Sequence, residues 1–155
     1  MATQRIIDFL ATRRPDGPCL VLDLDVVADN FRAFERALPN SKIYYAIKAN
    51  PAPEILRLLA QMGSSFDAAS VAEVEMAMNA GAPASRISFG NTIKKERDIA
   101  RAYQLGVRLF AVDCVEEVEK IARVAAGSRV FCRVLTDGEG AEWPLSRKFG
   151  CVPAM

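Results

Sequence analysis

The stretch that decides the fold is Tyr45-Ala46-Ile47-Lys48-Ala49-Asn50-Pro51, which places one lysine between an apolar run and a helical pattern. Residues 43–47 are β-branched, aromatic or small, which predicts a short buried strand. Asn50 and Pro51 suit the N-cap and the first turn of the helix that follows. Because active sites of parallel α/β folds lie at the C-terminal ends of strands, Lys48 is a candidate catalytic residue. A lysine that only extends from a strand end to water is the alternative.

The strand-then-helix pattern recurs at a nearly constant interval. Strands are predicted to begin near residues 43, 65, 87, 108 and 129, with single helical patterns between them. Strands that are separated by single helices run parallel and are joined by right-handed crossovers. The sequence therefore predicts an α/β fold with a parallel sheet of about five βα units.

Short signals mark where the helices begin. Ser70-Val71-Ala72-Glu73 is a capping box, and Asp113-Cys114-Val115-Glu116 follows the same logic with aspartate as the cap. Asp25 is expected to cap a helix that follows a strand at residues 18–24. In the helix after Asp113, the periodicity predicts four inward-facing apolar positions, which are Val118, Ile121, Ala122 and Ala125.

Polar residues follow the apolar part of each predicted strand, and they are Lys48, Asp67, Asn91, Asp113 and Arg133. The C-terminal ends of parallel strands share one edge of a sheet, so these side chains are expected to form one site. Helix capping is an alternative explanation for Asp113 and Asn91. Glu73 also has a capping role that requires no catalysis.

Composition limits the function further. The net charge of +1 arises from 20 basic and 19 acidic residues among 155, which indicates neither a nucleic-acid nor an anionic-membrane partner. A small-molecule partner is expected instead. The chain has no histidine, which excludes histidine-based nucleophile systems, and no metal site is expected. Its four cysteines form no C-x-x-C pair and are expected to be reduced, partly buried thiols, Cys151 among them.

The first ten residues are too polar for a secretory signal, and no apolar run approaches the ~18 residues of a membrane span, so we expect a cytoplasmic protein. Residues 1–40 are interpreted as a lead-in with one strand and one helix, and residues 41–155 as the βα units. A (β/α)8 barrel needs eight strands and typically ~250 residues, so it cannot close within this chain. Either the sheet is open, or these residues are the N-terminal portion of a longer protein.

A family signature surrounds Lys48. Residues 45–50, with Ile55, Leu56, Leu59 and Gly63 after them, resemble the pyridoxal-phosphate attachment signature of the ornithine, diaminopimelate and arginine decarboxylases, which have the alanine-racemase fold. Every position of that signature is present. Four later segments resemble the ornithine decarboxylase branch in particular, and they are residues 66–70, 87–91, 109–113 and 145–150. The resemblance extends from about Pro18 to the last residue.

The resemblance implies a partial (β/α)8 barrel with pyridoxal 5'-phosphate as cofactor, and it assigns residues 18–24 to the sheet of a C-terminal β-domain. Lys48 is then the lysine that binds the cofactor covalently. A lysine attacks an aldehyde as the neutral amine, which partial desolvation at a strand end favours. Asp67 and Glu73 are expected near this lysine to receive its ammonium, and Arg133 is expected close to the cofactor.

The implied function is decarboxylation of ornithine, or of ornithine together with lysine, to a diamine such as putrescine for polyamine synthesis, by a homodimer. The family's ring-stacking histidine, glycine-rich phosphate loop and pocket cysteine have no counterpart here, so we expect these 155 residues alone to be inactive. Diaminopimelate or arginine decarboxylation is an alternative function. A non-catalytic decarboxylase-like binding module and a small single-barrel pyridoxal-phosphate carrier are two others.

Overall fold

The computed structural model describes residues 2–136, 140, 142 and 149–152. The chain divides into two compact units, Met1–Ser41 and Lys42–Met155. The second unit contains all five strands, which are β1 (Tyr44–Ala46), β2 (Ser65–Ala68), β3 (Ile87–Phe89), β4 (Leu109–Val112) and β5 (Arg129–Cys132). They form one parallel sheet in sequential order, as the sequence predicts.

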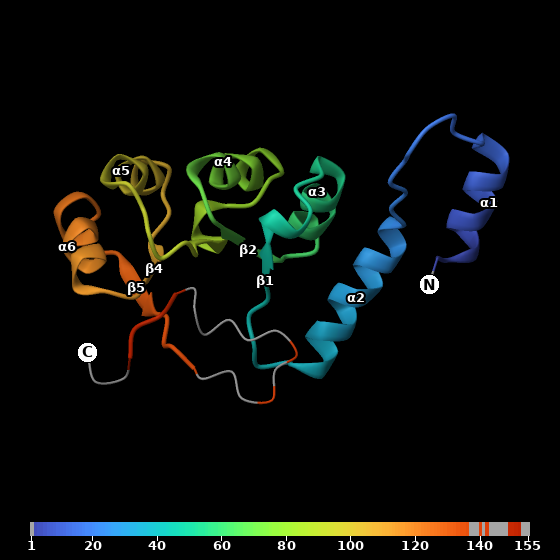
Figure 1. The fold of residues 1–155 in the computed structure, drawn as a ribbon. Helices are drawn as coiled ribbons and strands as arrows, with labels where there is room; N and C mark the ends of the chain where they lie inside the picture. The colour runs from blue at the N-terminus through green and yellow to red at the C-terminus, as the bar shows by residue number, and fades with distance from the viewer. Residues whose placement is uncertain (1, 137–139, 141, 143–148, 153–155) are drawn as a thin grey trace. The chain divides into compact units, whose positions relative to one another are not determined.

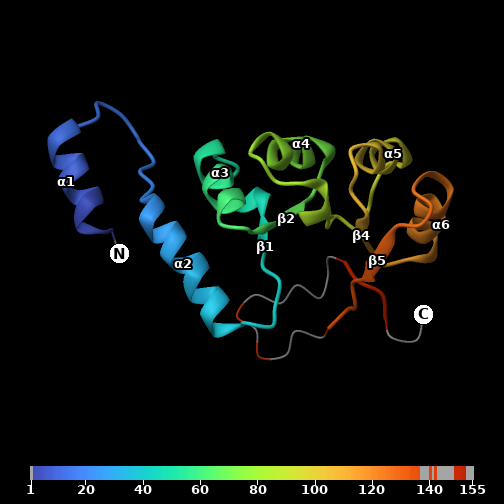
Figure 2. The ribbon, with the colours of Figure 1, turned by 180° about the vertical axis from the view of Figure 1, so that it is seen from behind.

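Single helices connect these strands. They are α3 (Pro53–Gln61), α4 (Val71–Asn79), α5 (Glu96–Gln104) and α6 (Val115–Val124), with short 3-10 turns η1 (Ile47–Ala49) and η2 (Ala84–Arg86). Figure 1 shows α3 to α6 together on one side of the strands, and Figure 2 shows the same from behind. A sheet whose sequential strands carry helices on one face only is built like part of a (β/α)8 barrel, because a doubly wound sheet has helices on both faces.

The two faces of the sheet differ in character, because successive side chains of a strand point to opposite faces. Phe66 and Ala68 of β2 and Phe110 of β4 are buried, and together with Val74 of α4 and Ile99 of α5 they belong to the apolar core. The residues between them in each strand, such as Asp67 between Phe66 and Ala68, lie on the other face. This second face holds the candidate site.

The first unit contains α1 (Gln4–Arg13) and α2 (Leu24–Ala37). Residues 18–23 form no strand, contrary to the prediction for residues 18–24, because a strand needs a hydrogen-bonded neighbour and no described strand pairs with them. The cap of α2 is Asp23 and not Asp25, since the Asp23 carboxylate accepts from the Asp25 amide at 3.1 Å. The Thr3 hydroxyl donates to Asp23 at 2.8 Å and so links the starts of both helices.

Two predicted helix starts in the second unit are also corrected. The N-cap of α3 is Ala52, while Asn50 accepts from the Ala52 amide at 3.1 Å and so shapes the preceding turn. The N-cap of α6 is Cys114, and its side chain makes no capping bond. The Ser70 cap of α4 is confirmed, because its hydroxyl accepts from the Glu73 amide at 3.3 Å.

The inward face of α6 also differs from the prediction. Ile121 and Ala125 are buried as expected, but Val118 and Ala122 are exposed, and the third inward position is Glu117. These three buried positions follow each other at steps of four residues, which is one face of a helix. The buried face of α6 therefore includes the acidic residue Glu117, which a search for apolar positions alone does not find. Among the described residues, none of the helices has the length and apolar character needed to cross a membrane.

Candidate functional site

Lys48 lies two residues beyond β1, in the 3-10 turn η1. Ile47 before it is fully buried, whereas Lys48 itself is exposed. The Tyr45 hydroxyl donates to the Asn50 carbonyl at 3.1 Å and so stabilises this turn. Burial raises the pKa of Tyr45, so its hydroxyl remains a donor. The described residues do not bury Lys48, and its expected partial desolvation stays a prediction.

Asp67 is half-buried in β2 and lies directly opposite Ser88 of β3 in the parallel register. The Ser88 hydroxyl donates to Asp67 Oδ1 at 2.8 Å and fixes the carboxylate. Gly90 follows β3, and its amide donates to the Ala68 carbonyl at 2.8 Å. A Cβ at Gly90 would lie 2.0 Å from Asp67 Oδ1. The carboxylate therefore occupies space that only a glycine at position 90 leaves free.

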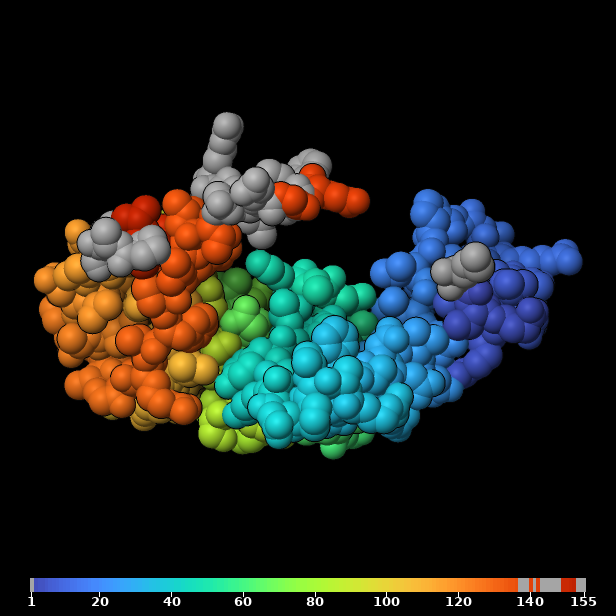
Figure 3. All heavy atoms as spheres, turned by 90° about the horizontal axis from the view of Figure 1, so that it is seen from below, coloured from blue at the N-terminus to red at the C-terminus, as the bar shows by residue number. Residues whose placement is uncertain are grey.

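Asp67 and Arg133 line one cavity of about 610 Å³ on the face of the sheet opposite to α3–α6. Ser88 adds a hydroxyl, and Leu109, Ala111 and Phe131 add apolar walls. Figure 3 shows the second unit from this side, with green and yellow segments recessed beside the orange segment around β5. A mostly apolar cavity with a few charged and hydroxyl groups is the usual character of a small-molecule site.

The predicted site residues separate into two groups. The structure brings Asp67 and Arg133 to the same cavity, but neither Lys48 nor Glu73 is among the described residues that line it. Glu73 Oε2 accepts from the Ala69 amide at 2.5 Å, so its carboxylate serves the start of α4. The capping explanation therefore accounts for the position of Glu73 in this structure.

Arg133 and Asp113 contact the segment that follows β5. The Arg133 guanidinium carbon lies 5.4 Å from the centroid of the Phe149 ring, and the Arg133 amide donates to the Val112 carbonyl at 2.8 Å. Asp113 Oδ2 accepts from the Gly150 amide at 3.1 Å. Asp113 therefore anchors this segment instead of capping α6.

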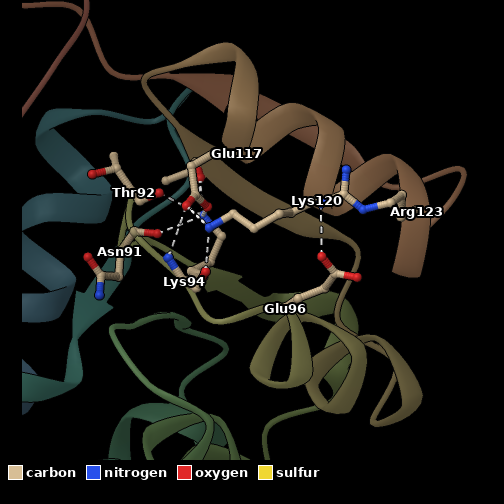
Figure 4. Close-up of polar contacts among 8 residues, drawn as sticks. Asn91, Thr92, Lys94, Glu96, Glu117, Lys120 and Arg123 are labelled. Atoms are coloured by element: carbon tan, nitrogen blue, oxygen red, sulfur yellow. Dashed lines mark hydrogen bonds and ion pairs between the residues drawn. The ribbon is translucent and has the colours of Figure 1, made fainter.

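A buried ion pair holds the loop between β3 and α5 at the same rim. Lys94 Nζ lies 3.1 Å from Glu117 Oε2, and both side chains are almost completely buried. The same ammonium donates to the carbonyls of Asn91 at 2.9 Å, Thr92 at 3.1 Å and Ala111 at 2.6 Å. Figure 4 shows these groups converging from the loop and from α6, with Lys120 reaching Glu117 along the helix.

The charges of this cluster stabilise each other. Burial lowers the pKa of Lys94, although Glu117 opposes the shift. Burial by itself would raise the pKa of Glu117, but hydrogen bonds from Lys120 and Lys94 outweigh it and lower this pKa. The charged cluster of Lys94, Glu117 and Lys120 was not predicted from the sequence. Ser88 and Gly90 were also not identified from it as the residues that position Asp67. The available signals were an acid at an inward helical position and a serine inside an apolar strand.

These features define a class of protein: an α/β fold of the barrel type, with a cavity along the face of its parallel sheet opposite to α3–α6. Residues 24–154 match the family model described as "Pyridoxal-dependent decarboxylase, pyridoxal binding domain". The chain belongs to this family.

Individual relatives agree with this assignment. The chain is 38% identical to the lysine/ornithine decarboxylase of Selenomonas ruminantium over 96% of its own length and 37% of that protein. It is 40% identical to the chloroplastic ornithine decarboxylase of Nicotiana glauca over 88% of its length and 32% of that protein. The solved lysine/ornithine decarboxylase of Vibrio vulnificus, complexed with putrescine, has a TM-score of 0.82 at 33% identity, over 97% of this chain and 39% of that one. The chain thus spans about a third of the curated relatives.

Gly90→Ala tests the contact between position 90 and Asp67. The added methyl group would force the carboxylate away from Ser88, so we expect a loss of about 1–3 kcal/mol in the free energy of unfolding. Gly17→Ala is the control, because a Cβ there has no heavy atom within 4 Å. Urea unfolding of both variants measures the effect. Equal stability of the two would show that Asp67 moves aside freely.

Proposed function

We propose that this chain is the cofactor-binding portion of a pyridoxal-phosphate-dependent decarboxylase that acts on ornithine, or on ornithine together with lysine. The observation that carries the proposal is the cavity that Asp67 and Arg133 both line, in a unit whose first strand leads into Lys48. Membership of the pyridoxal-dependent decarboxylase family supports the cofactor. The names of the two curated relatives support the substrate class.

The residues of the cavity fit pyridoxal phosphate chemically. The cofactor is an anion with a flat aromatic ring, and Arg133 offers a planar guanidinium for its anionic groups. The apolar walls at Ala111 and Phe131 suit the ring, and the absence of a side chain at Gly90 lets the Asp67 carboxylate lie in the cavity. The donor set therefore agrees with the group that the family name implies.

In the proposed site, Lys48 holds the cofactor covalently and Arg133 holds it by charge. Asp67, whose carboxylate is fixed by Ser88, would orient the cofactor. Asp67 and Glu73 would offer negative charge to the Lys48 ammonium. When bound, pyridoxal phosphate accepts the electrons that remain at the α-carbon after carbon dioxide leaves. For Glu73 this role requires that its carboxylate leave the Ala69 amide.

The proposed product is a diamine such as putrescine, which would place the protein in polyamine synthesis, and the proposed working form is a homodimer. Arginine and diaminopimelate remain the competing substrates. We further propose that these 155 residues need additional groups for turnover. The test below therefore supplies those groups from a relative.

A chimaera tests the function. Residues 1–155 would replace the matching N-terminal part of the Selenomonas ruminantium enzyme, and carbon dioxide release would be measured with ornithine, lysine, arginine and diaminopimelate. We expect release from ornithine, alone or with lysine, and none in the same chimaera with Lys48→Ala. The unaltered relative is the control for assay and folding. A chimaera that binds pyridoxal phosphate yet decarboxylates only arginine or diaminopimelate, or none of the four, would contradict the proposal.

A further inference from the structure

Two cysteines meet at the end of the sheet. Cys132 is the last residue of β5, and Cys151 forms an isolated parallel bridge with Val134. The Cys151 amide donates to the Arg133 carbonyl at 2.9 Å, and the Leu135 amide donates to the Cys151 carbonyl at 2.8 Å. The two Sγ atoms are 3.2 Å apart. Backbone pairing thus brings two thiols into contact across 19 positions of the sequence.

The register explains why these thiols face each other. Cys132 and Val134 are two residues apart along an extended chain, so their side chains point to the same side, opposite to Arg133. Cys151 is the bridge partner of Val134 and shares that side. Cys132 is exposed and Cys151 half-buried, so a soluble oxidant can reach the pair. The expectation that all cysteines are partly buried thiols is wrong for Cys132 and Cys19, which are both exposed.

We propose that Cys132 and Cys151 are a modification site, at which a small disulfide such as oxidised glutathione converts the two thiols into an intramolecular disulfide. One protein thiolate attacks the oxidant, forms a mixed disulfide and releases one glutathione thiolate. The second protein thiolate then attacks the mixed disulfide, forms the Cys132–Cys151 bond and releases the second glutathione. The two protein thiols lose two electrons, the oxidant gains them, and the two protons pass to the released glutathiones.

A Cys132–Cys151 disulfide would make the position of Arg133, which lines the cavity, depend on the redox state of the two cysteines. Phe149 and Gly150 lie immediately before Cys151, and they contact Arg133 and Asp113 respectively. A covalent link from Cys151 to β5 would hold this segment on the sheet, and with it Phe149 beside the Arg133 guanidinium. Contact with Cys151 raises the pKa of Cys132, which keeps the pair as thiols until an oxidant arrives. The oxidised chain therefore has a more restricted Arg133 than the reduced chain.

The test uses the full 155-residue chain in buffers of graded reduced and oxidised glutathione. Free thiols are alkylated, and peptides are mapped by mass spectrometry. We expect a Cys132–Cys151 link at ratios that leave Cys19 and Cys114 alkylated. We also expect an equilibrium constant for the link at least about tenfold larger in buffer than in concentrated urea. Cys132→Ser should abolish the link, and the control Cys114→Ser should leave it intact.

The conformational part has its own measurement, which is amide hydrogen exchange at Gly150 and Cys151. We expect both amides to exchange about tenfold more slowly in the oxidised chain. Equal equilibrium constants in buffer and urea, or stable mixed disulfides at both cysteines, would overturn the modification site. A link that forms without slowing exchange would overturn its effect on the rim. None of these readouts depends on cofactor or decarboxylation, so the inference stands or fails independently of the proposed function.

Discussion

Lys48→Ala is expected to abolish the site-specific, borohydride-reducible attachment of pyridoxal phosphate to this chain. Covalent attachment requires a primary amine that can lose its proton and reach the aldehyde. Lys48 is exposed in η1, so the aldehyde has access to it. Arg133 and Asp67, in the cavity of the same unit, supply the charges that would hold the cofactor long enough to react. Other lysines are expected to react weakly and without saturation.

The measurement is titration with pyridoxal phosphate, followed through its visible absorbance, then borohydride reduction and peptide mapping. Lys48→Arg keeps the positive charge but cannot form the bond, so it should lose labelling as completely as Lys48→Ala. Lys95→Ala is the matched control, since Lys95 is an exposed lysine directly before α5 whose side chain makes no capping bond, and it should leave labelling unchanged. Labelling spread over many lysines, and equal in all variants, would show that these residues do not organise the cofactor lysine by themselves.

The sheet could be predicted from the sequence because each strand is a short apolar run between polar ends. Strands were expected near residues 43, 65, 87, 108 and 129, and the structure starts them at Tyr44, Ser65, Ile87, Leu109 and Arg129. A parallel sheet buries these runs on the helix side, so hydrophobicity marks them clearly. Asp67 of β2 and Arg133 after β5 line one cavity, although two strands lie between β2 and β5. Their roles at a cofactor stay predictions.

What failed depended on contacts between segments far apart in sequence. Asp113 is a residue type that often caps helices, but here its carboxylate accepts a hydrogen bond from the Gly150 amide, 37 positions later. Residues 18–24 read as a strand, yet a strand forms only where a neighbour offers hydrogen bonds. Lys48 is predicted at a strand end, but β1 stops at Ala46 and Lys48 lies exposed in η1. The conformational preferences of single residues and their neighbours in sequence do not indicate such distant contacts.

The buried pair of Lys94 and Glu117 is the strongest case of this kind, and its disruption should be the most destabilising change. Glu117→Gln would leave the Lys94 ammonium buried without a counter-charge. Removing one partner of a buried ion pair costs about 3–5 kcal/mol, and we expect a loss of this size in the free energy of unfolding at neutral pH. Glu119→Gln, an exposed position of the same helix, is the control and should be nearly neutral.

The pH dependence gives a second, sharper readout. The folded-state pKa of Glu117 is lowered from its ordinary 4.5, so its contribution is complete above that value and is lost as pH falls through the lowered pKa. The wild type should therefore lose stability on acidification more steeply than Glu117→Gln, which has no carboxylate to protonate. Urea unfolding at neutral pH and at values below 4.5 measures both slopes. Parallel slopes would mean that Glu117 is not ionised in the fold.

The double variant Lys94→Met with Glu117→Leu separates the ion pair from the anchoring of the loop. An apolar pair of similar size removes both buried charges, which by itself is often neutral or stabilising. The carbonyls of Asn91, Thr92 and Ala111 would still lose the donor that Lys94 supplies, at about 1 kcal/mol or more for each buried acceptor left unpaired. We therefore expect the double variant to recover only part of the stability that Glu117→Gln loses. Full recovery would show that the ammonium serves only Glu117, and that the loop between β3 and α5 keeps its place at the rim without it.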